Sequence, residues 1–399
     1  MKLLDGVKKE MLQIEYWTTD NSLIMDNEDI INFNNKIIST DVYRRFSLKD
    51  GELPTDEKRR EFVLYNLKQQ KNISEFNEIE NQIKEGLDHF GNEYKYGICL
   101  KRDAMMSLPI SGTWEQRKKF TISPLHVNEG VIIYSETKDG KWVFIRSEIY
   151  YGWVKKDSIA LCHSREEMIK YLDFSDFLVV IGESLTISFN ESDKFIIKYD
   201  MGDRIEIIEE DKDNYYITIF NSNVNGYVVK KKGVIPKNAC VYKGYLDFSK
   251  TNMISECFKC LGTGYKWGGG EEQRDCSSTV MEIFSTFGII FPKSTKWQLK
   301  VPFKKYDLSE LEIKDKCTIL DSIPTGSLLF TERHVMIYLG KSEKEHFIFH
   351  NVGKFCQKDD YKEEHEYGVT ISSLERTYTS DRKCWLNFLK TVLVIGNDS

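Results

Sequence analysis

The chain has 399 residues, of which 41% are hydrophobic and 30% charged, so it holds enough apolar side chains for packed cores. At roughly 150 residues per domain, this length predicts about two to three domains. The net charge of −6 argues against a nucleic acid or an anionic membrane surface as a partner, since both require a basic face. No run of about 18 apolar residues is present, so we expect no membrane-spanning segment.

Residues 1–94 have the pattern of a helical N-terminal segment, for which we expect a scaffold or docking role. Apolar side chains recur at helical spacing from 30 to 38, directly behind the candidate capping residues Asp26 and Asn27. Two further helices are expected, one around 62–67 and one over 73–87.

After residue 94 the pattern changes to short apolar runs separated by turn signals, which is typical of β-structure. The run at 131–134 and the run after it flank Asp139-Gly140, a dipeptide that favours a hairpin turn. Residues 95–163 are therefore expected to form a small β-barrel.

Residues 164–245 are expected to form a second barrel, which begins with a short helix capped by Ser164. One of its apolar runs lies at 195–197. The two stretches share one plan, in which Trp153 and Tyr227 take equivalent places after an aromatic run. They resemble an internal repeat of two bacterial SH3-like domains.

Residues 246–399 mix helices and strands, and Cys276 stands directly before an amphipathic helix that Asp275 is placed to cap. A thiol at a helix N-terminus faces free backbone N–H groups and the positive end of the helix dipole, which lower its pKa. The same N–H groups suit the oxyanion of a tetrahedral intermediate. The glycines at 268–270 lack the Gly-Lys-Ser/Thr of a phosphate loop and are expected to let the backbone approach this site.

A cysteine nucleophile needs a base, and the base needs a residue that orients it. His334 opens an apolar strand, and His350 ends the next strand along the chain. Neighbouring antiparallel strands would bring these two rings side by side. His346 lies on the same strand face as His350 and is the alternative orienting residue. By pattern alone, buried structural residues remain an alternative for all of them.

The remaining cysteines and histidines are expected to be structural or solvent-exposed. Cys257 and Cys260 form half of a zinc or redox motif, but they lie in an apparent helix and are expected to be buried thiols. No recognisable spacing connects Cys317, Cys356 and Cys384. Four histidines are expected in solvated loops: His89, His126, His163 and His365.

Nine cysteines are an odd number over a long chain, which suits reduced thiols in a cytoplasm better than a disulfide framework. The first residues also lack the apolar stretch of a signal peptide. We therefore expect a cytoplasmic protein, the alternative being an exported or cell-wall-associated one whose signal peptide has been removed.

Several motifs in the C-terminal part resemble those of the NlpC-type cell-wall cysteine peptidases, a papain-like family. The resemblance implies an α+β multi-domain protein with a helical N-terminal segment, two SH3-like barrels and a peptidase domain at 246–399. The motifs are Tyr265-x-Trp267-Gly268-Gly269, Arg274-Asp275-Cys276-Ser277, Pro292-Lys293-Ser294-Thr295 with Gln298, Gly326-Ser327-Leu328-Leu329-Phe330 and His334-Val335-x-Ile337-Tyr338-Leu339-Gly340.

In this family a cysteine is the nucleophile, a histidine the base and a second polar residue the orienting group, roles that the resemblance gives to Cys276, His334 and His350. Relatives with this domain arrangement cleave the bond between γ-D-glutamate and a diamino acid in peptidoglycan stem peptides. Those that act in muropeptide recycling require a free N-terminal L-alanine. No metal or organic cofactor is implied, and the oligomeric state stays open.

The resemblance also implies five substrate-binding residues. Asp275 and Ser277, which flank the nucleophile, would bind the free amine, and a carboxylate is a suitable partner for an ammonium. Tyr265 would lie close to the nucleophile, while Ser294 and Thr295 would line the substrate groove.

The chain departs from the family at two places. Relatives often carry Arg where this chain has Lys293, and Asp or Asn where it has Ser294, so we expect its substrate contacts to differ from theirs at these positions. The first barrel walls off the pocket in relatives, and Tyr150 and Tyr151 are candidates for that role. A cell-wall amidase or acyltransferase on the same scaffold remains an alternative, as does a catalytically dead peptidoglycan-binding module.

Overall fold

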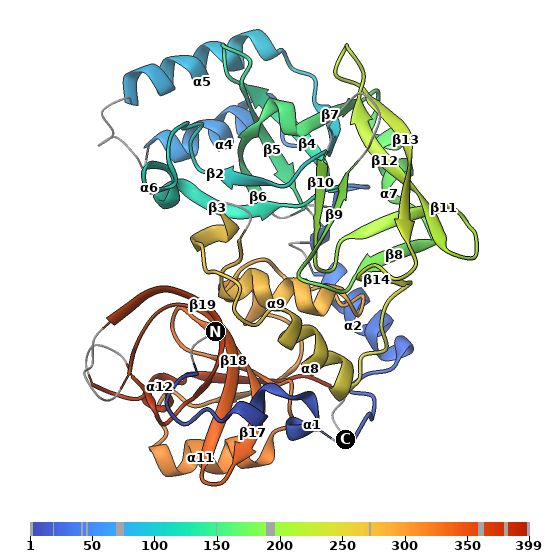
Figure 1. The fold of residues 1–399 in the computed structure, drawn as a ribbon. Helices are drawn as coiled ribbons and strands as arrows, with labels where there is room; N and C mark the ends of the chain where they lie inside the picture. Colours follow the sequence, from blue (N-terminus) through green and yellow to red (C-terminus); the bar gives the residue numbers. More distant parts are fainter. Residues whose placement is uncertain are drawn as a thin grey trace.

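The structure is a computed structural model that describes residues 3–18, 20–40, 43–44, 47–68, 76–148, 150–188, 196–270, 273–357, 363–378 and 382–396. Ile73 and Phe195, which belong to a predicted helix and a predicted strand, lie outside these ranges. Figure 1 shows the two β-rich regions on one side of the molecule and the C-terminal domain on the other. Among the described residues, no helix is long and apolar enough to cross a membrane.

The N-terminal helices join two different cores. They are α1 (Ile14–Trp17), α2 (Asn27–Ile38), α4 (Asp56–Lys68) and α5 (Phe76–Phe90). Asp26 caps α2 by accepting a hydrogen bond from the N–H of Asp29, as predicted. The buried side chains of α2 join the core of the C-terminal domain, whereas those of α4 and α5 join the core of the first barrel. The segment thus contacts both halves of the molecule (Figure 1).

The first β-rich region is a seven-stranded antiparallel sheet in the order β3-β2-β6-β5-β4-β1-β7. Asp139-Gly140 makes the predicted hairpin between β4 and β5, with Gly140 at φ +66°. The region also holds α6 (Trp114–Arg117). The strands are β1 (Lys95–Cys99), β2 (Asp103–Met106), β3 (Thr121–Leu125), β4 (Gly130–Glu136), β5 (Trp142–Ser147), β6 (Tyr150–Lys155) and β7 (Ile159–Cys162).

The second β-rich region follows α7 (Arg165–Leu172), which Ser164 caps as predicted. It has a five-stranded sheet in the order β13-β12-β11-β8-β14 and a two-stranded sheet of β9 and β10, so the two regions are not identical repeats. Trp153 is fully buried in β6, whereas Tyr227 precedes β13 and stacks on His163. The strands are β8 (Phe177–Val180), β9 (Ser184–Ser188), β10 (Ile196–Asp200), β11 (Arg204–Glu210), β12 (Asn214–Ser222), β13 (Val228–Pro236) and β14 (Val241–Lys243).

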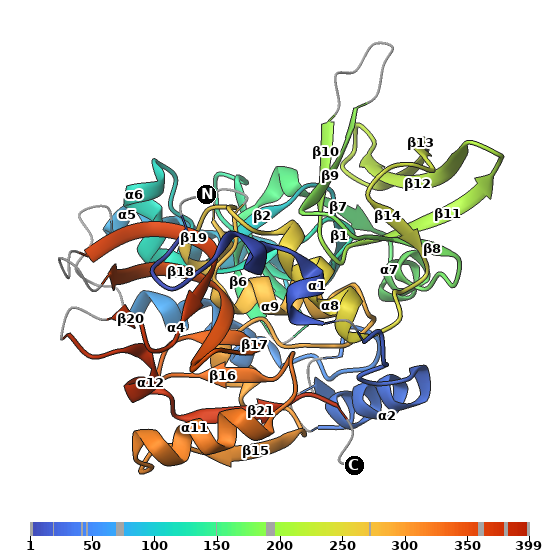
Figure 2. The same cartoon turned by 60° about the horizontal axis from the view of Figure 1, so that its bottom comes forward.

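The C-terminal domain packs helices on a sheet whose main order is β15-β21-β16-β17-β18-β19, with β20 paired to β18. Helix α9 packs on β17 and β18 and lies at the centre of the molecule (Figures 1 and 2). The predicted α+β fold class is confirmed. The helices are α8 (Lys250–Lys259), α9 (Cys276–Ser285), α10 (Thr295–Gln298), α11 (Ile313–Ser322) and α12 (Trp385–Phe388), and the strands are β15 (Lys304–Asp307), β16 (Leu328–Phe330), β17 (Val335–Ser342), β18 (Glu345–Gln357), β19 (Glu363–Ser373), β20 (Thr377–Tyr378) and β21 (Thr391–Val394).

A buried charge cluster joins the two barrels to α9. His126 follows β3 and is only 4% exposed, so the prediction of a solvated loop is wrong. Its Nδ1 lies 3.1 Å from Asp203 of the second barrel, and its Nε2 lies 3.7 Å from Glu282 of α9. Burial lowers the pKa of His126, but the charge of Asp203 and the other nearby carboxylates raises it to about 9. The imidazolium therefore helps to hold three regions of the chain together.

The other three histidines expected in loops divide differently. His89 lies near the end of helix α5, and His365 lies in strand β19 opposite Lys354, so neither is in a loop. His163 is exposed in a bend, as predicted. Cys257 and Cys260 are buried at the end of α8, as predicted.

Candidate active site

Cys276 is the first residue of α9, as the sequence predicts, because Asp275 fixes the start of this helix. The Asp275 carboxylate accepts a hydrogen bond from the N–H of Ser278 at 2.8 Å, and the Ser278 hydroxyl accepts one from the N–H of Asp275. This reciprocal pair is a capping box. It leaves the Cys276 side chain at the positive end of the helix.

The Cys276 thiol is 7% exposed and lies among hydrogen-bond donors. The backbone N–H groups of Val335 and Ser277 and the side chain of Thr295 all contact the sulfur. Burial nevertheless raises the pKa of Cys276 to about 12, with a further contribution from the negative charge of Asp275. The lowered pKa expected from the helix N-terminus is therefore wrong, because desolvation of the thiolate outweighs the favourable dipole and hydrogen bonds.

The structure brings His334 and His350 together. His334 directly precedes β17 and His350 lies in β18, the neighbouring antiparallel strand, so the rings meet with Nε2 of His334 3.0 Å from Nδ1 of His350. The other nitrogen of His350 lies 2.9 Å from the hydroxyl of Ser372 in β19. The Trp385 ring packs edge-on against both imidazoles, at centroid distances of 4.9 and 5.0 Å.

Burial keeps both imidazoles of this pair neutral. It lowers the pKa of His334 to about 3 and that of His350 well below its ordinary value, with the proximity of His334 adding to the effect. A neutral His334 has one protonated and one unprotonated nitrogen. If Ser372 accepts from Nε2–H of His350, then Nδ1 of His350 accepts from Nε2–H of His334. Nδ1 of His334 is then the nitrogen free to take a proton.

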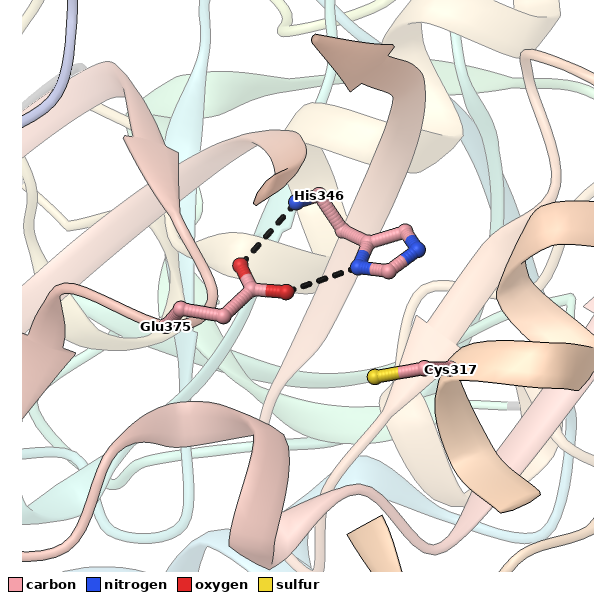
Figure 3. A group of neighbouring side chains, drawn as sticks. All are labelled: Cys317, His346 and Glu375. Carbon is pink, nitrogen blue, oxygen red and sulfur yellow. Dashed lines mark hydrogen bonds and ion pairs between the residues drawn. The ribbon is translucent and has the colours of Figure 1, made fainter. Parts of the chain in front are cut away.

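His346, the alternative orienting residue, is not beside His334. Its Nδ1 lies 2.7 Å from a carboxylate oxygen of Glu375, and its Nε2 lies 3.0 Å from Asp321 (Figure 3, which draws the Glu375 contact). His350 is therefore the histidine of β18 that contacts His334.

Tyr265 lies in the neighbourhood of the cysteine. Burial raises the pKa of Tyr265 strongly, and the charges of Cys276 and Asp275 are near enough to raise it further. A Cβ atom on Gly353 of β18 would stand 2.8 Å from the Tyr265 ring. Gly353 thus leaves the space that the ring occupies.

Ser277 and Lys293 link α9 to the segment before α10 and to the first barrel. The Ser277 hydroxyl lies 3.0 Å from Asp275 and 3.1 Å from the carbonyl of Lys293. The Lys293 ammonium forms a partly buried ion pair with Glu129 of the first barrel at 2.6 Å and also contacts the carbonyl of Pro124. Lys293, where relatives often carry Arg, therefore makes a contact between the C-terminal domain and the first barrel.

The first barrel reaches the site through Tyr150. Burial raises the pKa of Tyr150 to about 12, and both Ser294 and Asp275 of the C-terminal domain lie near enough to the phenol to influence that pKa. Tyr151, the other candidate for the pocket wall, stacks on Phe62 in the aromatic core of the barrel. Of the two, Tyr150 is the residue placed at the site.

The glycines at 268–270 approach both the site and the barrel. The N–H of Gly268 donates to Asp275 at 3.1 Å, and Gly268 and Gly269 have positive φ angles of 62° and 68°. A Cβ atom on Gly270 would stand 2.0 Å from the Trp114 ring of α6. The expected close approach to the site is present, and the same turn packs tightly on the first barrel.

Sequence reasoning missed Ser372 and Trp385, which complete the histidine pair. Ser372 lies on the same face of the sheet as His350, a relation that becomes visible only once the pairing of β18 with β19 is known. No pattern around Trp385 points to the site. Trp385 begins α12, and Lys316 of α11 holds this helix in place by donating to its carbonyls, including that of Leu386.

Comparisons with known proteins agree with this arrangement. Residues 262–384 match the model of the NlpC/P60 family, and residues 119–155 match that of the SH3 domain of SH3b1 type. The chain is similar in structure to an NlpC/P60 endopeptidase from Photobacterium damselae subsp. piscicida, with 15% identity and a TM-score of 0.74, over 100% of this chain and 99% of that one. It is also similar to an NlpC/P60 family protein from Bacillus cereus ATCC 10987, with 16% identity and a TM-score of 0.54, over 76% of this chain and 100% of that one. At these identities the likeness shows a shared fold. No curated protein matches the sequence.

Proposed function

We propose that the protein, whose residues 262–384 match the NlpC/P60 family model, is a cysteine peptidase that cleaves the γ-D-glutamyl–diamino acid bond of peptidoglycan stem peptides. The observation that carries the proposal is the hydrogen-bonded series His334–His350–Ser372. His334 directly precedes Val335, whose backbone N–H contacts the Cys276 sulfur, so the series begins close to the thiol. This series gives the thiol both a base and a group that orients the base.

The neutral thiol and imidazole define the order of proton transfer. As the Cys276 sulfur attacks the γ-carbonyl carbon, its proton passes to Nδ1 of His334, and the resulting imidazolium is stabilised through Nε2–H by His350. The backbone N–H of Cys276, at the N-terminus of α9, is suited to the oxyanion. The carbon–nitrogen bond then breaks, His334 gives its proton to the leaving amine, and water hydrolyses the thioester to restore the thiol.

Asp275 is the group that we assign to a free N-terminal amine. A carboxylate has about four acceptor positions, and three are used here by the N–H of Ser278, the Ser277 hydroxyl and the N–H of Gly268. One position remains on the half-buried carboxylate for an ammonium donor. Tyr150 from the first barrel lies near Asp275 and Ser294 and would close this end of the groove.

A requirement for a free amine also defines the source of the substrate. The N-terminal L-alanine of a stem peptide has a free amine only after the peptide has been released from the glycan. We therefore propose a role in muropeptide recycling, in the cytoplasm. None of the nine cysteines, all of which lie in the described part of the chain, forms a disulfide, which suits a reducing compartment.

The test is mass spectrometry of L-Ala-γ-D-Glu-diaminopimelate incubated with the wild type and with Cys276→Ala, beside an N-acetylated copy and a copy with lysine. We expect L-Ala-D-Glu from the free-amine peptides with the wild type alone. Cleavage of the acetylated peptide at a similar rate would move the substrate toward intact wall. No cleavage of any peptide would contradict the endopeptidase and favour an amidase, an acyltransferase or a binding module.

Asp275→Asn separates the proposed amine contact from the capping role. Asn caps a helix about as well as Asp, so the variant keeps the start of α9 but loses the negative charge. The kcat/KM for the free-amine peptide should fall by roughly 10- to 100-fold, the range of a charge-assisted hydrogen bond, mainly through KM. An unchanged KM would show that another group binds the amine.

A further inference from the structure

A second group of reactive side chains lies at the start of β18, four residues before His350. Cys317 of α11, His346 of β18 and Glu375, which follows β19, have ligand atoms that all lie within 4.8 Å of one another. Figure 3 shows the Cys317 sulfur directed toward the His346–Glu375 pair. The sequence gives no hint of this group because its members are separated along the chain.

We propose that Cys317, His346 and Glu375 bind a divalent transition-metal ion, for which zinc fits the donor set best. Zinc is bound in proteins by thiolate, imidazole and carboxylate, the three donors present here. Three protein ligands leave a fourth tetrahedral position for water. This site is distinct from the candidate active site around Cys276 and shares no side chain with it.

The groups behind these ligands are already arranged as metal sites require. A histidine ligand normally donates its second ring N–H to a carboxylate, which fixes the tautomer and the ring. Nε2 of His346 lies 3.0 Å from Asp321, which leaves Nδ1 toward Glu375 as the ligating atom. Glu375 is itself held by the Ser373 hydroxyl and by the backbone N–H of His346.

The charges also suit a dication. A Cys317 thiolate and the Glu375 carboxylate supply two negative charges, which balance a doubly charged ion. The third acid, Asp321, is neutralised by Lys341, whose ammonium lies 2.7 Å from each of its oxygens. Tyr338, whose ring lies 6.2 Å from that of His346, adds a neutral phenol.

Only small movements are needed for coordination. Around tetrahedral zinc, nitrogen and oxygen ligands are about 3.3 Å apart, and sulfur lies about 3.6 Å from either. The His346 Nδ1 to Glu375 distance of 2.7 Å would therefore open slightly, and the sulfur, within 4.8 Å of both, would move by on the order of 1 Å. Cys317 is half-buried and Glu375 is 25% exposed, so an ion has a path from solvent.

Coordination displaces protons in a defined way. The Cys317 thiol loses its proton, and a protonated His346 loses the one on Nδ1 while keeping Nε2–H on Asp321. Binding therefore releases up to two protons and weakens at low pH. The bound ion would join α11 to β18 and to the end of β19, and so would stiffen the strand that carries His350.

The test uses full-length protein in a Cys276→Ala background, so that the thiol near His334 and His350 cannot contribute. Metal-free protein is titrated with Zn²⁺ against a chromophoric chelator, and its Co²⁺ form is examined for thiolate-to-cobalt charge-transfer absorption. We expect one ion per chain with a cobalt–thiolate band. Cys317→Ser should lose the band and weaken binding at least about 100-fold, and Glu375→Gln should weaken it about tenfold or more.

Cys240→Ser is the matched control, because Cys240 is an exposed thiol outside the group and its loss should change neither result. Melting in chelator shows whether each variant is folded. Equal zinc affinity in Cys317→Ser and its parent would overturn the proposal. So would the absence of a cobalt–thiolate band in the parent, a result that needs no variant to fold.

Discussion

Two histidines on one face of β18, four residues apart, have opposite electrostatic surroundings. His350 is 2% exposed and contacts His334 and Ser372, and burial holds its pKa well below the ordinary value. His346 is 1% exposed, and although burial lowers its pKa, hydrogen bonds to Glu375 and Asp321 raise it above the ordinary value. Since both rings are equally buried, the carboxylates make the difference.

This difference suits the two positions on the strand to different tasks. A neutral imidazole pair can take a proton from a thiol, so the His334–His350 pair suits acid–base chemistry. An imidazole held between carboxylates suits an ion pair or a metal site, as at His346. Burial alone therefore does not predict what a histidine does, and the identity of its hydrogen-bond partners does.

Removal of His334, the proposed base, should reduce activity more than any other change on this strand pair. In His334→Ala, kcat for the γ-D-glutamyl peptide should fall by about 10³-fold, because general-base catalysis contributes on the order of 10²–10⁴. The exposed His89 of α5 offers a matched control, and His89→Gln should keep the wild-type rate. Steady-state kinetics measure both. A loss of less than tenfold in His334→Ala would assign the base to another residue.

Replacement of the orienting ring should have the next largest effect. His350→Ala removes the acceptor for Nε2–H of His334, so kcat should fall by about 10²-fold, within the range for proton-transfer groups. His350→Asn offers an amide oxygen and should recover part of the loss. If the alanine and asparagine variants had the same kcat, the loss of activity would not come from the missing hydrogen-bond acceptor at position 350.

Ser372→Ala should have a smaller effect. It leaves Nε2 of buried His350 without its partner, a cost of about 1–3 kcal/mol that disfavours the productive tautomer. We expect kcat to fall about tenfold with KM unchanged and with a changed acid limb in the pH–rate profile. A rise in KM with the profile unchanged would point to a structural role.

His126 should affect stability more than rate. Its folded-state pKa of about 9 lies above the unfolded value of about 6.5, so its stabilising contribution is complete below pH 6.5 and is lost as the pH rises through 9. The free energy of unfolding of the wild type, measured in urea, should therefore fall as the pH rises across this window. The same quantity for His126→Gln should depend less on pH. Identical slopes for the two proteins would remove His126 from the cluster between the barrels and α9.

The sequence predicts what depends on neighbours along the chain. Asp26, Ser164 and Asp275 are identified as helix caps because a cap bonds to a backbone N–H two or three residues ahead. Cys276, His334 and His350 are found because motif and strand order place them. The α+β class and the NlpC-type resemblance follow from the same local patterns and are confirmed.

The sequence does not predict what depends on distant partners. His126 is buried because Asp203 and Glu282 come to it from two other regions. The raised pKa of Cys276 has a similar origin, since the surrounding chain removes water from the thiol and outweighs the helix N-terminus. The group of Cys317, His346 and Glu375 likewise exists only after α11 packs on the sheet.

The neutral state of the Cys276–His334 pair is tested most directly by alkylation of Cys276 with iodoacetamide as a function of pH. The rate at the Cys276 peptide is followed by mass spectrometry, with exposed Cys240 of the same chain as an internal reference. Since the folded-state pKa is raised to about 12, reactivity at Cys276 should still be rising above pH 8.5, the ordinary midpoint for a thiol. A plateau reached below pH 7 would contradict a neutral pair and show a thiolate–imidazolium ion pair in its place.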